Sequence, residues 1–256
     1  IDGLVDAYKS FADDKYLLEA ISIFDYLKSN NYSDNRLVHS YTTDSKQKEV
    51  FLEDYALLAK GALSLYEVTL DVTYLDFAKE LMTSAISKYK NESGLFYYNT
   101  SSALVPKIIN TSDGVVPSAN AIMGQNLFKL GHLEYNTDYL EHVALMGSLL
   151  VDEFERQPIN YGTWGSLLLS QVYPFYEVAV VGDNAKALVT ELGGFYLANT
   201  LVVGSTTSSD IALFKDRYSE EETFVYVCQN NTCRLPVKTA KEAYGQMKLF
   251  GYPGVE

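Results

Sequence analysis

The sequence contains few of the residues that build disulfide frameworks or metal centres: two cysteines, three histidines and one tryptophan among 256 residues. Two cysteines cannot form a disulfide framework for a chain of this size, so the hydrophobic core has to supply the stability. No apolar run approaches the roughly 20 residues that span a bilayer, and the N-terminus lacks a basic region followed by an apolar stretch. We therefore expect no membrane-spanning helix.

Positive charge is scarce as well. Lys and Arg number 20 against 33 Asp and Glu, which gives a net charge of -13. Such a chain repels phosphate backbones and anionic lipid headgroups, so nucleic acids and membranes are poor partners. Hydrophobic residues make up 47% of the chain and aromatic residues 13%, which excludes intrinsic disorder and suffices for one large domain or two small ones.

A repeat of modest strength sets the organisation of the chain. The segment Asp13–Ala20 recurs as Asp71–Ala78 and, more loosely, as Asn136–Val143, each time with a Tyr-Leu pair at the same offset. Each copy opens with a residue that favours a helix N-cap and continues with apolar residues at helical spacing. Each copy therefore predicts the start of a helix.

A second helix precedes each copy. Gly3 and Tyr8 stand at the same offsets before the first copy as Gly61 and Tyr66 before the second, and Gly124 lies in an apolar stripe before the third. The repeat unit is therefore a helical hairpin, and three hairpins are expected over about residues 1–155. Because a hairpin buries its apolar face only against neighbours, the hairpins should form an array. A helix is already in progress at residue 1, so we expect the array to be truncated there.

Short extended runs connect the expected hairpins. Residues 36–41 and 94–98 are aromatic and bounded by Asn, Ser and Gly, which predicts small strands on one rim. One more helix is expected at about 163–173. After it we expect strands near 177–182, 200–203 and 223–228 and helices near 185–197 and 239–250. The chain thus divides into a helical-hairpin region, residues 1–175, and a small α/β appendage, residues 176–256.

Carboxylates gather at one rim of the expected array, because the first helix of every hairpin begins on the same side. That rim is expected to carry Asp2, Tyr41, Glu53, Asp54, Phe96, Tyr98 and Asp113. Carboxylates and aromatic faces around an opening are typical of sugar sites, where paired acids transfer protons. The alternative role of first-turn acids is helix capping and compensation of the helix dipole.

Other candidate catalytic groups are few. His39 lies in an aromatic rim segment and can donate a proton, whereas His132 and His142 are expected at the end and on the outer side of the third hairpin. Ser118 stands at a helix start without a glycine-flanked elbow, so nucleophilic serine chemistry is not expected. Trp164 fits either the core or a stacking platform.

The two cysteines, Cys228 and Cys233, are separated by an Asn-rich segment that turns easily. A disulfide that closes a turn, or two buried thiols, accounts for the pair, and a redox role needs a partner that this chain does not contain. A zinc site needs about four ligands, and no histidine or further cysteine lies beyond His142, so no metal is expected. The turn at residues 181–183 lacks the glycines of a dinucleotide fingerprint, and no cofactor is predicted.

Four motifs carry a resemblance to a known family: Phe51–Ala56, Asp113–Asn120, Glu177–Gly182 and Tyr226–Cys233. In order and spacing they are similar to the C-terminal part of the thioredoxin-domain-containing proteins related to spermatogenesis-associated protein 20. The resemblance implies a mainly α fold, a partial (α/α)6 toroid of helical hairpins related to six-hairpin glycosidases and N-acylglucosamine 2-epimerases. It also implies an N-terminal thioredoxin-like domain that this chain lacks. Family members commonly have Trp-Asn-Gly where this chain has Ile1-Asp2-Gly3, so the resemblance assigns no role to Asp2.

Two functions follow as hypotheses. The first is a carbohydrate-active enzyme of glycosidase or sugar-epimerase type, with Glu53, Asp54 and Asp113 as catalytic acids. Its substrate contacts would be His39, Tyr41, Tyr98, Ser118 and Asn120. The alternative is a non-catalytic binding or scaffold module attached to a thioredoxin-like domain. Open hairpin faces would also promote self-association, and the compartment stays open, with the cytoplasm favoured.

Overall fold

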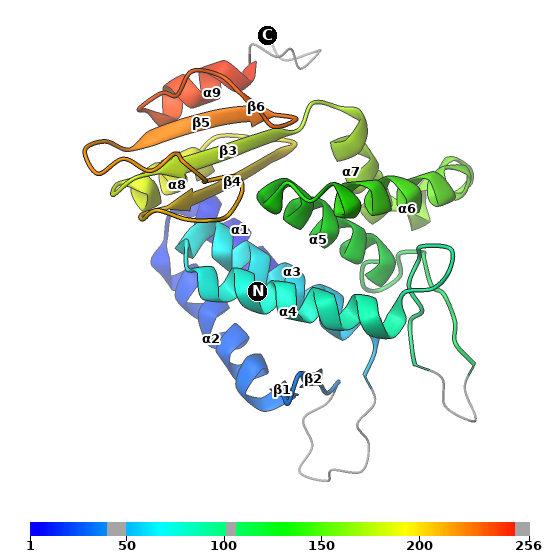
Figure 1. The fold of residues 1–256 in the computed structure, drawn as a ribbon. Helices are drawn as coiled ribbons and strands as arrows, with labels where there is room; N and C mark the ends of the chain where they lie inside the picture. Colours follow the sequence, from blue (N-terminus) through cyan, green and yellow to red (C-terminus); the bar gives the residue numbers. More distant parts are fainter. Residues whose placement is uncertain (40–49, 101–105, 249–256) are drawn as a thin grey trace.

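The computed structural model describes residues 1–39, 50–100 and 106–248. In this part of the chain the three predicted hairpins are present: α1 (Asp2–Phe11) with α2 (Asp14–Asn31), α3 (Leu52–Thr69) with α4 (Val72–Tyr89), and α5 (Ala119–Glu134) with α6 (Thr137–Arg156). The first helices pack in a row, α1 on α3 and α3 on α5, and α7 (Gly162–Val172) continues the row against α5 (Figure 1). The expected array of helical hairpins is thus confirmed.

The three hairpins turn in the same way. The residue that ends the first helix has a left-handed backbone in each case, at Ala12, Leu70 and Tyr135, with φ of 51°, 61° and 49°. The next residue is the predicted N-cap Asp or Asn, whose side chain accepts a backbone N–H two or three residues further on. A left-handed non-glycine residue costs about 1–2 kcal/mol, so packing of the two helices has to hold each turn in place.

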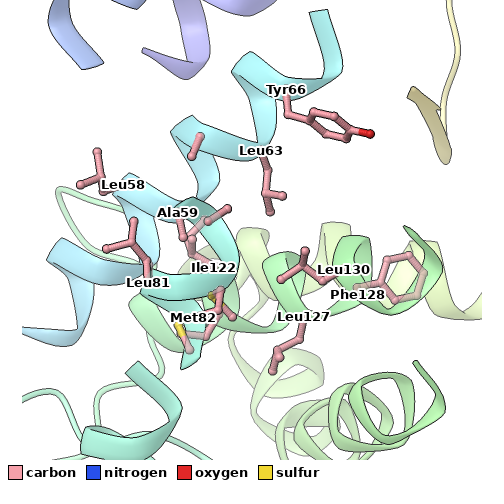
Figure 2. Close-up of a cluster of buried hydrophobic side chains, with 14 of the residues drawn as sticks. Leu58, Ala59, Leu63, Tyr66, Leu81, Met82, Ile122, Leu127, Phe128 and Leu130 are labelled. Carbon is pink, nitrogen blue, oxygen red and sulfur yellow. The ribbon is translucent and has the colours of Figure 1, made fainter. Parts of the chain in front are cut away.

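Apolar side chains fill the space between the helices. Figure 2 shows residues of α3, α4 and α5 that converge on one another, among them Leu63, Met82 and Leu127, all of them buried. Trp164 on α7 is fully buried, and its indole N–H donates to the carbonyl of Thr111 at 2.8 Å. The tryptophan therefore belongs to the core and is not a stacking platform.

A small sheet follows the hairpins. Its strands are β3 (Tyr176–Val181), β4 (Thr200–Ser205), β5 (Phe224–Gln229) and β6 (Thr232–Cys233), in the order β4-β3-β5-β6. β3 pairs in parallel with β4 and antiparallel with β5, and α8 (Ala185–Gly193) connects β3 to β4. Helices α8 and α9 (Ala240–Lys248) cover one face of the sheet and the hairpins cover the other (Figure 1). The predicted C-terminal α/β part is thus present, although α8 ends before the expected residue 197.

The two predicted rim strands differ from the expectation. β1 (Tyr32–Ser33) and β2 (Arg36–Leu37) form a two-residue ladder. Of the rest of the predicted run, residues 38–39 are not in a strand, and residues 40–41 lie outside the described residues. In the described chain, residues 94–98 form one isolated bridge, between Phe96 and Lys90, instead of a strand. The side-chain amide of Asn120 bonds both the N–H and the carbonyl of Phe96, and so occupies the groups that a longer ladder would use.

Candidate functional site

Two of the predicted rim acids, Glu53 and Asp54, lie at the first turn of α3, where the chain enters the helix. Phe51 precedes the helix in an extended conformation, and Asp54 Oδ2 accepts from its backbone N–H at 2.8 Å. An acid at this position satisfies an N–H that the helix leaves free and meets the positive end of the helix dipole. The capping role that the sequence left open is therefore present for Asp54.

Asp54 also holds an imidazole. Its Oδ1 lies 2.8 Å from Nδ1 of His39, whose ring meets the Phe51 ring edge-on at 5.1 Å. Phe51 stacks on Tyr98 with ring centroids 5.0 Å apart, and the Tyr98 hydroxyl donates to Glu53 Oε1 at 3.0 Å. We call these five residues, His39, Phe51, Glu53, Asp54 and Tyr98, the α3 rim cluster.

Tyr98 is a fixed hydrogen-bond donor in this cluster. Burial and the hydrogen bond to Glu53 raise the pKa of Tyr98 to about 12, so its hydroxyl stays protonated at neutral pH. The backbone N–H of Leu52 donates to the Tyr98 carbonyl at 2.9 Å and fixes this segment against the start of α3. A carboxylate has about four lone-pair positions, so Glu53 has the capacity to accept further hydrogen bonds.

A cavity of about 550 Å³ opens beside the cluster, and we call it the rim cavity. His39, Glu53 and Asp54 supply ionisable groups to its lining. The apolar lining comes from Ile1, Ile23, Leu27, Leu37, Val38, Leu57, Leu58, Val116 and Pro117. Small-molecule sites measure roughly 300–1,000 Å³ and combine apolar walls with a few convergent polar groups. The rim cavity has both properties.

An ion pair lines another part of the rim cavity. Asp2 Oδ2 lies 2.7 Å from Lys60 Nζ, and Asp2 Oδ1 accepts from the Ser64 hydroxyl at 2.5 Å. Burial acts to raise the pKa of Asp2, but the bonds from Lys60 and Ser64 outweigh it and hold that pKa below its ordinary value. Sequence reasoning missed Lys60, although its spacing of seven residues from Glu53 places both on one face of α3.

Asp113 and Ser118 hold the loop that enters α5. Asp113 Oδ1 accepts from the backbone N–H of Ser118, and Oδ2 accepts from that of Thr163, both at 2.8 Å. Ser118 is the N-cap of α5, and its Oγ accepts an N–H of the first helical turn at 3.3 Å. Residues 116–117 of this loop line the rim cavity. The two side chains therefore shape a wall of the cavity through the backbone that they bind.

Asn120 lies deeper, beneath the rim. The residue is fully buried, and its Oδ1 accepts from the N–H of Phe96 at 2.8 Å. Its Nδ2 donates to the carbonyls of Phe96 and Asn110, each at 2.9 Å. The amide thus ties two loops to α5. Tyr41, the remaining predicted contact, lies outside the described residues.

Three further predictions concern metals, membranes and the cysteines. Within residues 1–39, 50–100 and 106–248, no group of three or more His, Cys, Asp and Glu side chains is placed to hold a metal ion. No helix in those ranges has the length and apolarity that crossing a bilayer requires. Of the two alternatives for the cysteines, the structure has the disulfide, which joins Cys228 on β5 to Cys233 on β6.

Fold and site together define a chain of α/α hairpins with an open cavity at the start of α3, followed by a small α/β sheet. This chain is a distant homologue of spermatogenesis-associated protein 20, with 25% identity to the Homo sapiens protein and 24% to that of Rattus norvegicus, each over 73% of the chain. An uncharacterized protein of Caenorhabditis elegans is 25% identical over 94% of the chain. The chain spans 26% of the length of the mammalian relatives and 36% of the worm protein.

The other two comparisons, with family models and with solved structures, say less about this chain. No family model matches the chain. Among solved structures, the GH76 α-mannanase BT2949 of Bacteroides thetaiotaomicron is similar, with a TM-score of 0.48 and 16% identity. The similarity covers 59% of this chain and 41% of the mannanase, and it concerns the fold.

Proposed function

We propose that the rim cavity binds a carbohydrate and that Glu53 and His39 act on it as acid/base groups. The observation that carries the proposal is the α3 rim cluster at the edge of a cavity of about 550 Å³. Three members of the cluster, His39, Glu53 and Asp54, line this cavity, and they offer a carboxylate and an imidazole held by a second carboxylate. The aliphatic lining suits the apolar face of a sugar, and the polar groups suit its hydroxyls.

Each polar member of the cluster has a distinct part in this proposal. Glu53 exchanges a proton with the sugar, while the hydroxyl of Tyr98 holds one of its oxygens in place. Asp54 bonds Nδ1 of His39, which fixes the imidazole tautomer and directs proton transfer to Nε2. Asp54 is therefore a positioning residue, and Asp113 keeps the cavity wall in place. An acid and a base at one sugar meet the needs of glycoside hydrolysis or epimerisation.

Binding is tested by thermal-shift measurements against a library of mono- and disaccharides, because a ligand that binds only the native state raises the Tm. Glu53→Gln keeps the size of the side chain and removes its charge. Glu141→Gln, on the exposed side of α6, is the matched control. At least one sugar should raise the Tm of the unmodified chain and of Glu141→Gln, and this increase should vanish in Glu53→Gln. A library without any effect contradicts the proposal.

Catalysis is tested separately, by product analysis with the sugar that raises the Tm. Loss of a positioned acid/base group lowers a rate by about 10²–10⁴-fold, and we expect losses in that range for Glu53→Gln and His39→Gln. Asp54→Asn should lower the rate and also change its pH profile, because the imidazole loses its orienting charge. If the unmodified chain binds the sugar and returns it unchanged, the catalytic part of the proposal fails.

A non-catalytic binding or scaffold module is the second candidate, and a specific observation favours it. Three of the predicted rim acids are engaged by other groups: Asp2 by Lys60, Asp54 by a helix-capping N–H, and Asp113 by two backbone N–H groups. Acids engaged in helix caps and ion pairs are expected at a rim that binds a ligand without converting it. The rim cavity would then hold a ligand or partner, while a thioredoxin-like domain of a longer protein carried the chemistry.

A further inference from the structure

The disulfide lies in the sheet and shares no residue with the rim cavity. Cys228 and Cys233 are direct cross-strand partners on β5 and β6. Cys228 is fully buried, whereas Cys233 is partly exposed. Access to the two residues therefore differs, and a reagent from solvent meets Cys233 first.

A cation contacts the buried sulfur. Arg217 Nη1 lies 3.3 Å from Cys228 Sγ, and Nη2 lies within hydrogen-bond distance of the Tyr135 hydroxyl, at 3.2 Å. The guanidinium also lies over the ring of Tyr226, at 5.1 Å from its centroid. These contacts hold the charge in place before any negative charge forms on the sulfur. A fixed positive charge beside a cysteine stabilises its thiolate.

Two buried ionisable groups lie on the neighbouring strand and helix. Glu177 on β3 is the cross-strand partner of Cys228, and its Oε1 lies 2.5 Å from Nδ1 of His132. The imidazole thus engages one oxygen of the carboxylate, and Oε2 is buried without a hydrogen-bond partner among the described residues, whereas the guanidinium of Arg217 touches the sulfur itself. A charge in contact interacts strongly, so Arg217 Nη1, at 3.3 Å from Cys228 Sγ, favours negative charge on this sulfur.

We propose that Cys228–Cys233 is a redox-active disulfide that a dithiol reduces, with Cys233 as the sulfur attacked and Cys228 as the leaving group. A thiolate of the dithiol attacks Cys233 Sγ, the S–S bond breaks, and its electron pair goes to Cys228 Sγ, beside Arg217. The second thiol, once deprotonated, attacks the dithiol's own sulfur in the mixed disulfide and releases Cys233. The pair thereby gains two electrons, the dithiol becomes a disulfide, and its two protons pass to the cysteines or to solvent.

The geometry favours this direction of attack for two reasons. Thiol–disulfide exchange depends on access to the sulfur attacked, and it is faster when the leaving thiolate is stabilised. Cys233 has the access and Cys228 has the stabilising cation. Attack on Cys228 would meet a buried residue and would release Cys233 without the guanidinium in contact.

The rate of reduction of the native chain by dithiothreitol tests the role of Arg217. We expect reduction without denaturant, about tenfold slower in Arg217→Gln and close to the unmodified rate in Arg217→Lys. Lys215→Gln, an exposed neighbouring cation, is the matched control and should leave the rate unchanged. Reduction that needs a denaturant, or an equal rate in folded Arg217→Gln, overturns the proposal.

The site of attack is tested without any substitution, which keeps the proposal falsifiable even if Arg217→Gln does not fold. The native chain is mixed with reduced glutathione, a monothiol, and quenched with acid at successive times. Free thiols are then alkylated and peptides are mapped by mass spectrometry. Glutathione on Cys233 and the alkyl group on Cys228 are expected. Glutathione on Cys228 overturns the proposed direction.

Discussion

Replacing Glu67 by glutamine should destabilise the helical array through the loss of a buried charge. Glu67 lies in the last turn of α3 with its side chain 8% exposed, and its two oxygens bind Lys9 of α1 and Lys129 of α5 at 2.6 and 2.5 Å. Burial acts to raise the pKa of Glu67, but the two lysines outweigh it and lower that pKa from 4.5 to about 2. One carboxylate thus links three neighbouring helices.

The magnitude follows from that pKa. The difference between 4.5 and about 2 corresponds to about 3 kcal/mol, because one pKa unit is worth about 1.4 kcal/mol. Removal of one partner from a buried ion pair costs about 3–5 kcal/mol. The side chains of Lys9 and Lys129 are 32% and 30% exposed and can turn to solvent. We therefore expect the lower end, a loss of about 3 kcal/mol in the free energy of unfolding.

Urea unfolding followed by circular dichroism measures this loss, and its pH dependence identifies the cause. Because the folded pKa lies below the unfolded one, the carboxylate stabilises the fold fully above about pH 4.5 and loses this effect as the pH falls towards 2. The gap between the unmodified chain and Glu67→Gln should therefore narrow steadily in acid. Exposed Glu19→Gln is the control, with an expected change within about 0.5 kcal/mol. A gap below about 1 kcal/mol at neutral pH, or one that is unchanged in acid, refutes the reasoning.

Two further substitutions test buried polar groups by the same unfolding measurement. Asn120→Ala removes three hydrogen bonds and leaves the N–H and the carbonyl of buried Phe96 unsatisfied in the core, which should cost about 3 kcal/mol; a cost below about 1 kcal/mol would contradict the assigned role. The Tyr66 hydroxyl is buried without a hydrogen-bond partner among the described residues, and burial raises its pKa. Tyr66→Phe should therefore leave the stability unchanged or raise it by about 1 kcal/mol, and a clear fall would count against this argument.

Local signals in the sequence account for the success of the helix predictions. Asp13, Asp71 and Asn136 are N-caps in the structure, as the repeat predicted, because capping and apolar spacing act within a few residues. The left-handed turns before them had no such signal, since alanine, leucine and tyrosine are not turn formers. The rim run at 94–98 was wrong as a strand, because the amide of Asn120 reaches it from 24 residues away.

In the candidate site, too, local features could be predicted from the sequence, whereas contacts between distant residues could not. Glu53 and Asp54 could be placed at a helix start from the sequence, and their common rim with Tyr98 followed from the hairpin order. Their partners could not, because His39 is 15 residues from Asp54, and Tyr98 is 45 residues from Glu53. Which oxygen bonds which donor depends on how the connecting loops pack, and no periodicity in the chain encodes that.

Helix α3 carries acids at both ends, and the helix dipole explains their different surroundings. At its start, Glu53 and Asp54 meet the partial positive charge of free N–H groups, so an imidazole, a phenol and a backbone N–H suffice as partners. At its end, Glu67 meets the partial negative charge of free carbonyls and is held by two lysines. Glu67 also lines a cavity, of about 250 Å³, but a ligand there would have to compete with both ion pairs. We therefore place the proposed ligand binding and proton exchange at the start of α3, where they leave the ion pairs that link the array intact.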